Sequence, residues 1–206
     1  MSTLVIQSNN NITFKNINNE NDKSYNKRLI ENITINKKIK NRKIINNLED
    51  INNIKKLIII VPHLIENIIV KNIEMFNNKN PFISTLFDVE KSTDINLSFT
   101  NYFLRLIKHT NAESSSIIYA LCLLDRICNN NIIKLTYNNV HKLFFTSLVI
   151  SVKLLEDFTY SDSHYSKCGG VTNVELAMLE TIFLKYINYD ISVKDAFFNV
   201  YRNYLL

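Results

Sequence analysis

One long segment of the chain, residues 138–158 (NNVHKLFFTSLVISVKLLEDF), is apolar around most of its circumference when it is wound as an α-helix. The positions of Lys142, Thr146 and Lys153 mark only a narrow polar strip. A helix that is apolar on nearly every side must be enclosed by neighbouring elements. The pattern therefore predicts a central helix around which the rest of the chain is organised.

Helical periodicity of three to four residues continues on the N-terminal side of this segment. It predicts one helix that begins near Pro62, a second over residues 97–109 and a third over residues 113–128. Proline is tolerated in the first turn of a helix, so Pro62 is interpreted as a helix start. Residues 82–96 lack a sustained period and are interpreted as a long connection.

Two capping patterns predict the helices after the central segment. Thr172 stands three residues before Glu175, and Ser192 stands three residues before Asp195. A hydroxyl followed by a carboxylate at this spacing satisfies two backbone amides at a helix start. We therefore expect a helix at each of these positions.

The polar and aromatic segment that precedes Thr172, residues 159–170 (TYSDSHYSKCGG), is interpreted as a loop. It ends in Gly169 and Gly170, which are the only two glycines of the chain. Glycine tolerates unusual backbone angles, which suits a sharp entry into the next helix. The pair lacks the spacing of a phosphate-binding loop.

Charge and composition divide the chain into two parts. Residues 1–56 carry a net charge of +6 and contain 15 Asn, whereas residues 57–206 carry −1. The Asn-rich part has no periodic apolar face to offset the entropy of ordering. We therefore predict a low-complexity, mostly disordered leader over residues 1–55 and one domain over residues 56–206. The basic run at 37–43 is either a nuclear-import or polyanion-binding patch or a solvated tail.

The cysteines and the N-terminus indicate the cellular compartment of the protein. Three cysteines, Cys122, Cys128 and Cys168, suit free thiols in a reducing compartment better than a disulfide framework. The N-terminus lacks a signal-peptide pattern, and no apolar run reaches the 20 or so residues that span a membrane. We expect the nucleus, the cytoplasm or both.

Catalytic and metal-binding patterns are absent from the sequence. The four histidines lie on separate predicted elements, and the pair His164 and Cys168 lacks a second pair of zinc ligands. No nucleophile elbow, metalloprotease or kinase motif occurs. We therefore expect no active site, cofactor, metal or small-molecule substrate.

Several short motifs occur together in a characteristic order. They are residues 120–126 (ALCLLDR), 139–143 (NVHKL), 152–157 (VKLLED), 160–161 (YS), 169–170 (GG) and 175–180 (ELAMLE). Over residues 57–206, this combination resembles the single cyclin box of the P/U-type cyclins, which are related to phosphate regulation. The resemblance implies an all-α fold of five helices with an extra N-terminal helix and a C-terminal helix. It also implies a regulatory subunit that binds and activates a cyclin-dependent protein kinase.

The resemblance assigns roles to individual residues. It implies that Lys153 and Glu180 contact the regulatory helix of the kinase, with Leu154 and Tyr189 as apolar positions on the same face. Alternatively, Lys153 only caps the negative end of its own helix and Glu180 is a solvated charge.

The resemblance further implies a structural ion pair between Arg105 and Asp125, because a buried charge must be paired. Two other classes of protein remain as alternatives. One is a cyclin-fold scaffold that does not activate a kinase. The other is a relative of general transcription factors, which have two tandem boxes and bind DNA. The neutral charge of residues 57–206 argues against nucleic-acid binding.

Overall fold

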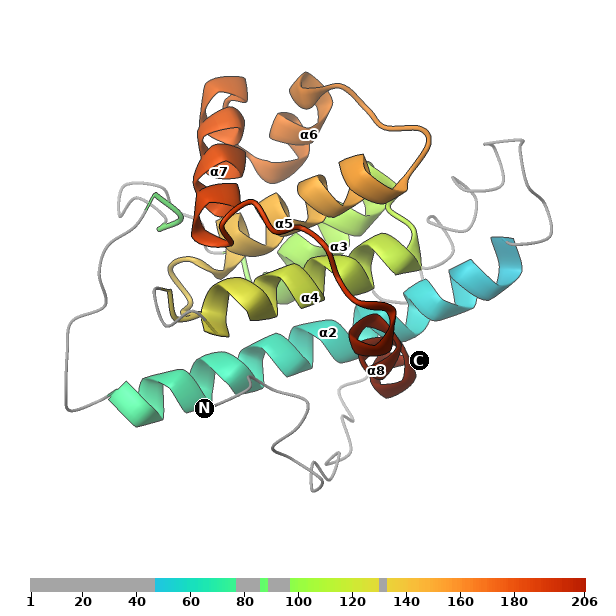
Figure 1. Cartoon of the computed structure of the whole chain (residues 1–206), viewed down its shortest axis with the longest axis horizontal. Coiled ribbons are helices and arrows are strands. Elements are labelled where there is room, and N and C mark those ends of the chain that lie inside the picture. Colours follow the sequence, from blue (N-terminus) through green and yellow to red (C-terminus); the bar gives the residue numbers. More distant parts are fainter. Residues whose placement is uncertain (1–46, 77–85, 89–96, 130–132) are drawn as a thin grey trace.

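The computed structural model describes residues 47–76, 86–88, 97–129 and 133–206 (Figure 1). Within these ranges the secondary structure consists of seven helices and no strand. The helices are α2 (Asn47–Phe76), α3 (Phe99–Thr110), α4 (Ser114–Asn129), α5 (Val140–Leu155), α6 (Asp162–Gly169), α7 (Asn173–Tyr186) and α8 (Asp195–Leu205). The expected all-α fold is confirmed, with α3 to α7 as the five-helix unit and α2 and α8 as the additional helices.

The central helix predicted from the apolar pattern is α5. Twelve of its 16 residues are buried, and it packs against α3, α4, α6 and α7 (Figure 1). Its buried hydroxyls bond to backbone carbonyls of the same helix: Thr146 to Lys142 at 2.7 Å and Ser151 to Ser147 at 2.8 Å. These short side chains let the neighbouring helices approach closely while their polar atoms stay satisfied.

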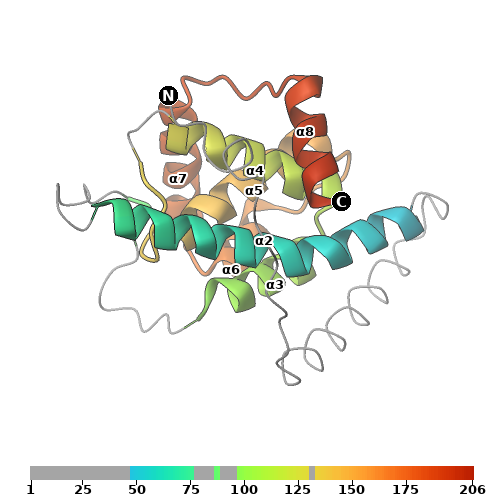
Figure 2. The same ribbon diagram turned by 90° about the horizontal axis from the view of Figure 1, so that it is seen from below.

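The long helix α2 runs beneath the other helices (Figures 1 and 2). It starts at Asn47, so the expectation that Pro62 begins this helix is wrong, and Pro62 lies inside α2. Apolar residues upstream of the proline, including Ile54, Leu57 and Val61, are almost fully buried. Their burial offsets the roughly 3 kcal/mol that a proline costs in a helix interior.

The boundary of the predicted leader falls within α2. The helix takes in residues 47–55, which precede the expected domain start at residue 56. Residues 1–46, with the basic run at 37–43, lie outside the described residues, as does most of the connection at 82–96. The division at residue 55 therefore stays a prediction.

The segment that was expected to be a loop contains the helix α6. Burial of Tyr165 and Cys168 ties this polar helix to the core. The next helix, α7, begins as predicted, because Thr172 Oγ1 accepts a hydrogen bond from the Glu175 amide at 3.1 Å.

The last helix is present, but Ser192 does not cap it. Lys194 is the N-cap residue of α8, and its side chain makes no cap hydrogen bond. The Ser192 hydroxyl instead bonds to Asp190 Oδ1 at 2.6 Å in the preceding segment. The cap expectation for α8 is therefore wrong, because a nearer carboxylate binds the hydroxyl.

The connection from α7 to α8 is held on the surface of α4. Tyr119 donates its hydroxyl proton to the Ile191 carbonyl at 2.7 Å and accepts from the Val193 amide at 3.1 Å. Arg126 donates to the Ser192 carbonyl at 2.6 Å. These bonds lead α8 back over the domain, where it packs against α4 and α2 (Figure 2).

The described helices include none that is both long and apolar enough to cross a membrane. The three cysteines are buried and unpaired, as the sequence indicated.

Candidate functional site

Lys153 joins three helices at one end of the domain. It lies in the last turn of α5, and its ammonium donates to Glu180 of α7, at 2.7 Å from Oε1 and 3.0 Å from Oε2. The same ammonium lies 2.8 Å from Asp162 Oδ1, at the start of α6. We call these three residues the Lys153 network. The structure therefore brings together Lys153 and Glu180, which the family resemblance selected.

The network is partly exposed to solvent. The side chains of Lys153 and Glu180 are 33% and 17% exposed, whereas that of Asp162 is 61% exposed. Partial burial lowers the pKa of Lys153, but hydrogen bonds and charge attraction from Asp162 and Glu180 outweigh it, so the pKa is raised above its usual value. The lysine is therefore charged at neutral pH and held in one position by two carboxylates.

The sequence pattern does not single out Asp162. Its segment was interpreted as a loop, and its role depends on α6 packing against both α5 and α7. The one sequence signal was an acidic residue directly after Ser161, which is the N-cap residue of α6.

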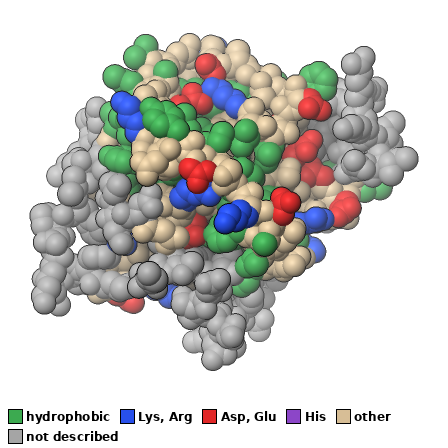
Figure 3. Space-filling model, viewed as in Figure 1, with side chains coloured by type: hydrophobic (Ala, Val, Ile, Leu, Met, Phe, Trp, Pro, Cys, Tyr) green, Lys and Arg blue, Asp and Glu red, His purple; other side chains and the backbone are tan. Residues whose placement is uncertain are grey.

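Exposed apolar side chains follow Lys153 in the chain, at the end of α5 and just after it. Leu154 is 44% exposed, Leu155 42% and Phe158 73%. Figure 3 shows hydrophobic side chains beside basic and acidic ones over the region of α5 to α7. Exposed apolar groups grouped around a fixed charge are typical of protein-binding surfaces.

Tyr189 stands apart from the Lys153 network. It follows α7 in the left-handed backbone conformation, with φ of 57°, and its side chain is exposed. Its amide donates to the Leu184 carbonyl at 2.7 Å, which closes the end of the helix. Among the described residues, no hydrogen bond or ring contact joins it to Lys153, Leu154 or Glu180. Its place on the same face stays a prediction.

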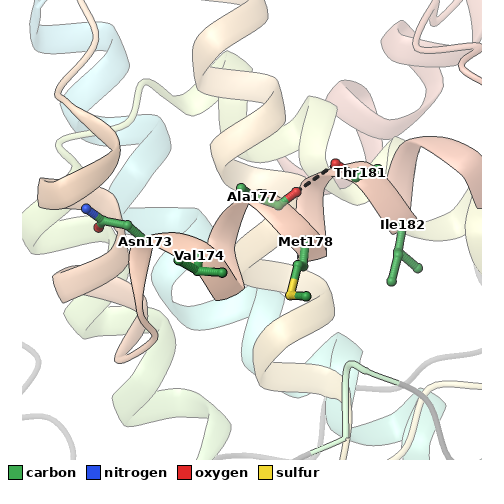
Figure 4. A pocket seen from close by; sticks show the side chains of 6 residues that line it. All are labelled: Asn173, Val174, Ala177, Met178, Thr181 and Ile182. Carbon is green, nitrogen blue, oxygen red and sulfur yellow. Dashed lines mark hydrogen bonds between the residues drawn. The ribbon is translucent and has the colours of Figure 1, made fainter.

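The outer surface of α7 is also apolar. Val174 and Met178 are 69% and 52% exposed, and with Ala177 and Ile182 they line a shallow hollow along this helix (Figure 4). Thr181 turns its hydroxyl to the Ala177 carbonyl at 2.8 Å, so it presents its methyl group more than its donor. An apolar hollow therefore lies on the outer surface of α7, the helix that also carries Glu180.

The two glycines allow α6 to sit close to α5. A Cβ atom on Gly169 would lie 2.4 Å from Cζ of Phe145, whereas Gly170 has a left-handed φ of 74° and caps α6. Any other residue would clash with Phe145 at position 169 and would be strained by the left-handed backbone at position 170. The pair thus places α6, and with it Asp162, against the end of α5.

The implied ion pair between Arg105 and Asp125 is not present. Arg105 donates to the Lys167 carbonyl on α6 at 2.8 Å. Asp125 is buried beside α8, where it accepts hydrogen bonds from Asn129 and Tyr201. The two side chains face different neighbours, because α3 packs on α6 and α4 packs on α8.

The environment of Asp125 is apolar. Burial raises the pKa of its carboxyl group to about 6, although the bonds from Tyr201 and Asn129 act in the opposite direction. Its Oδ1 atom has no hydrogen-bond partner. In the part of the chain that the structure describes, no group of three or more His, Cys, Asp or Glu side chains could hold a metal ion.

The comparison with known proteins decides the family. A family model described as Cyclin matches residues 6–191, which include α2 to α7. The chain belongs to the cyclin family. The match also reaches back into the segment that was expected to be a leader, and it ends before α8.

Several plant cyclins are similar to this cyclin. Cyclin-U2-1 of Arabidopsis thaliana is 29% identical over 74% of this chain and 69% of its own length. Cyclin-U4-1 of the same plant is 27% identical over 77% of this chain and 78% of its own length. Cyclin-P3-1 of Oryza sativa subsp. japonica is 24% identical over 71% of this chain and 61% of its own length. The cyclin is thus of the P/U type, and its role is that of a regulatory protein.

Proposed function

We propose that this cyclin binds and activates a cyclin-dependent protein kinase, and that the surface around the Lys153 network receives the kinase. The observation that supports this most is the geometry of Lys153, whose charge is fixed by carboxylates from two other helices. A side chain fixed in this way loses little further entropy when a partner binds.

The surrounding surface suits an apolar helix. Leu154 and Phe158 offer exposed apolar area close to Lys153 in the chain, and Val174 and Met178 offer more on α7, the helix that carries Glu180. Apolar contacts would supply most of the buried area, whereas Lys153 would set the register by binding polar groups of the partner. Tyr189 is proposed to lie at the edge of this surface.

In this proposal the chemistry stays with the kinase. A kinase needs its own lysine–glutamate ion pair in place and its activation segment ordered before it transfers a phosphoryl group. Binding energy from the cyclin would favour that arrangement over the inactive one. The cyclin itself would then need no catalytic residue, nucleotide or metal. We propose the nucleus, the cytoplasm or both as the site of action.

The test compares two substitutions of matched exposure. Leu154 and Val200 are 44% and 46% exposed, and they lie on α5 and α8. Affinity capture from cells identifies the kinase, and the pair is then reconstituted from purified proteins. Leu154→Asp should weaken binding about 30-fold or more, since an unpaired charge buried at an interface costs roughly 2 kcal/mol or more.

Val200→Asp should bind and activate as the wild-type cyclin does. Equal behaviour of the two variants in binding would show that the assigned surface is wrong. A wild-type cyclin that binds the kinase but leaves its activity unchanged would favour the scaffold alternative instead.

A further inference from the structure

Five basic residues lie on α3 and α6, two helices that pack against each other. On α3, Arg105, Lys108 and His109 share one face, because they lie three and four residues apart. On α6, His164 and Lys167 share a face for the same reason. We call these five residues the basic cluster. Figure 2 shows α3 and α6 together on the side of the domain opposite α8.

Two hydrogen bonds between the helices fix the cluster. Arg105 donates from Nη2 to the Lys167 carbonyl at 2.8 Å, and Nε2 of His164 lies 2.8 Å from the His109 carbonyl. The two helices therefore run antiparallel here, with Arg105 beside residue 167 and His109 beside His164. We call the line of contact between them the seam. The acceptors are backbone carbonyls in the last turns of α3 and α6, which carry partial negative charge but no formal charge, so the cluster keeps a net positive charge.

Carboxylates do not neutralise the cluster. Among the described residues, none of its five members forms an ion pair with Asp or Glu. Asp162 of α6 pairs with Lys153 instead, and Glu175 of α7 pairs with Lys142 at 2.9 Å. Positive charge is therefore concentrated on one side of a domain whose residues 57–206 carry a net charge of only −1.

The surroundings of His109 show the same excess of positive charge. Its pKa is lowered below the usual value, first by burial and then by the charges of Lys108, Arg105 and His164. All three named neighbours are basic. An anion bound among them would reverse this effect and favour the charged imidazolium.

Arg105 is held ready to bind an anion. The bond to the Lys167 carbonyl uses one of its five N–H groups. Next to it stands Gly170, where a Cβ atom would come within 3.9 Å of Nη2 and 4.0 Å of Nη1. Because residue 170 is a glycine, it has no side chain that could cover this part of the guanidinium group.

We propose that the basic cluster binds a phosphate monoester on a phosphorylated segment of a protein partner. A guanidinium fork matches two phosphate oxygens, and flanking lysines balance a dianion. The seam between α3 and α6 is an open surface, so a free phosphate would be contacted from one side only. A peptide segment gains further contacts along both helices. The site uses none of the Lys153 network and does not depend on kinase activation.

The test titrates the full-length cyclin with a short peptide that carries one phosphoserine among glycine and alanine. Histidine ring signals in NMR spectra follow binding, and a pH series follows the His109 titration. The phosphopeptide should shift the His109 and His164 signals and raise the pKa of His109. The unphosphorylated peptide should do neither, and inorganic phosphate should bind about tenfold more weakly or worse.

A pair of double variants with the same change in net charge controls for general attraction. Lys108→Gln with Lys167→Gln should weaken phosphopeptide binding about tenfold or more, since two charge-assisted contacts are lost. Lys185→Gln with Lys194→Gln, at exposed lysines on other surfaces, should change it less than about twofold.

Three results would each overturn the proposal. One is equal weakening by both double variants, which would mean attraction by net charge alone. Another is inorganic phosphate binding as tightly as the phosphopeptide. The third is a single-stranded RNA oligonucleotide that binds more tightly than the phosphopeptide and depends on the same two lysines.

Discussion

The ring of Phe145 occupies the place where a side chain on Gly169 would begin. Phe145 is fully buried in α5, and a Cβ on Gly169 would lie 2.4 Å from its Cζ atom. Helices α5 and α6 therefore pack closely at this point because Gly169 has no side chain. Since α6 carries Asp162, this contact also sets the geometry of the Lys153 network.

We expect Gly169→Ala to destabilise the cyclin by about 1–3 kcal/mol, the usual cost of overpacking a filled core. Urea unfolding should show a lower midpoint with an unchanged slope. Combining it with Phe145→Leu should recover part of the loss, because the smaller side chain leaves room for the methyl group. If the destabilisation of the double variant equals the sum of the two single-variant destabilisations, the two residues are not coupled, which would argue against the contact.

A second prediction concerns the Lys153–Glu180 pair. Lys153→Met, Glu180→Gln and the double variant form a cycle whose coupling energy should be about 1 kcal/mol, since the pair is partly exposed. Asp162→Asn should cost less than Glu180→Gln, because Asp162 is 61% exposed and Glu180 only 17%. A coupling energy of zero would show that the pair does not stabilise the folded state.

The pH dependence of this pair follows from the raised pKa of Lys153. The charged form is favoured in the folded state, so its contribution is complete below the unfolded-state pKa of about 10.4. The contribution should disappear as pH rises through the higher folded-state pKa. Unfolding measured from neutral to strongly alkaline pH should therefore show wild type and Lys153→Met converging only at the alkaline end.

Asp125 should make the cyclin less stable as pH rises from about 4 to about 6. Burial raises its pKa to about 6, so the folded state binds a proton more tightly than the unfolded chain does. Asp125→Asn keeps the shape of the side chain and cannot ionise. Relative to wild type, the variant should gain about 2–3 kcal/mol between pH 4 and pH 7, from about 1.4 kcal/mol per pKa unit.

Chemical denaturation at several pH values measures this gain directly. Tyr201→Phe removes a hydrogen bond to Asp125 and serves as the comparison, because it leaves the carboxyl group in place. It should keep the wild-type direction of the pH dependence. A difference between Asp125→Asn and wild type that does not change with pH would contradict the assignment.

Two truncations test where the folded domain begins. Deletion of residues 1–46 removes only the part that lies outside the described residues and should leave stability unchanged. Deletion of residues 1–55 also removes Ile51 and Ile54, which are 4% and 1% exposed, and should cost several kcal/mol. Thermal unfolding followed by circular dichroism separates the two outcomes. Equal stability of both fragments would place the boundary at residue 55, as the sequence predicted.

Residues with strong local patterns were predicted well. The apolar circumference of α5 and the Thr172 cap of α7 depend on neighbours within a few positions, so the sequence alone reveals them. The same holds for α3 and α4. The family motifs then selected Lys153 and Glu180, which lie 27 positions apart in the chain and make direct contact.

The failures concern features decided by tertiary packing. The polar composition of α6 concealed a helix that is held by Tyr165 and by the Gly169 contact, and so Asp162 was missed. At Pro62, a general preference for the first turn was outweighed by buried residues upstream. Arg105 and Asp125 matched family positions, but matching residue types did not determine which neighbours they contact.

Lys153 makes two hydrogen bonds to Glu180 and one close ion-pair contact with Asp162, which together equal the three protons of an ammonium group. No N–H group of Lys153 is therefore free to bind a partner protein. A partner that contacts Nζ of Lys153 must displace one of the two carboxylates that already bind it. Asp162 is the more exposed of the two carboxylates, so it is the one that can leave at the smaller cost. Binding of a partner at this position would then exchange one acceptor of Lys153 for another. Asp162 would bind Lys153 in the free cyclin, and an acceptor of the partner would replace it in the complex.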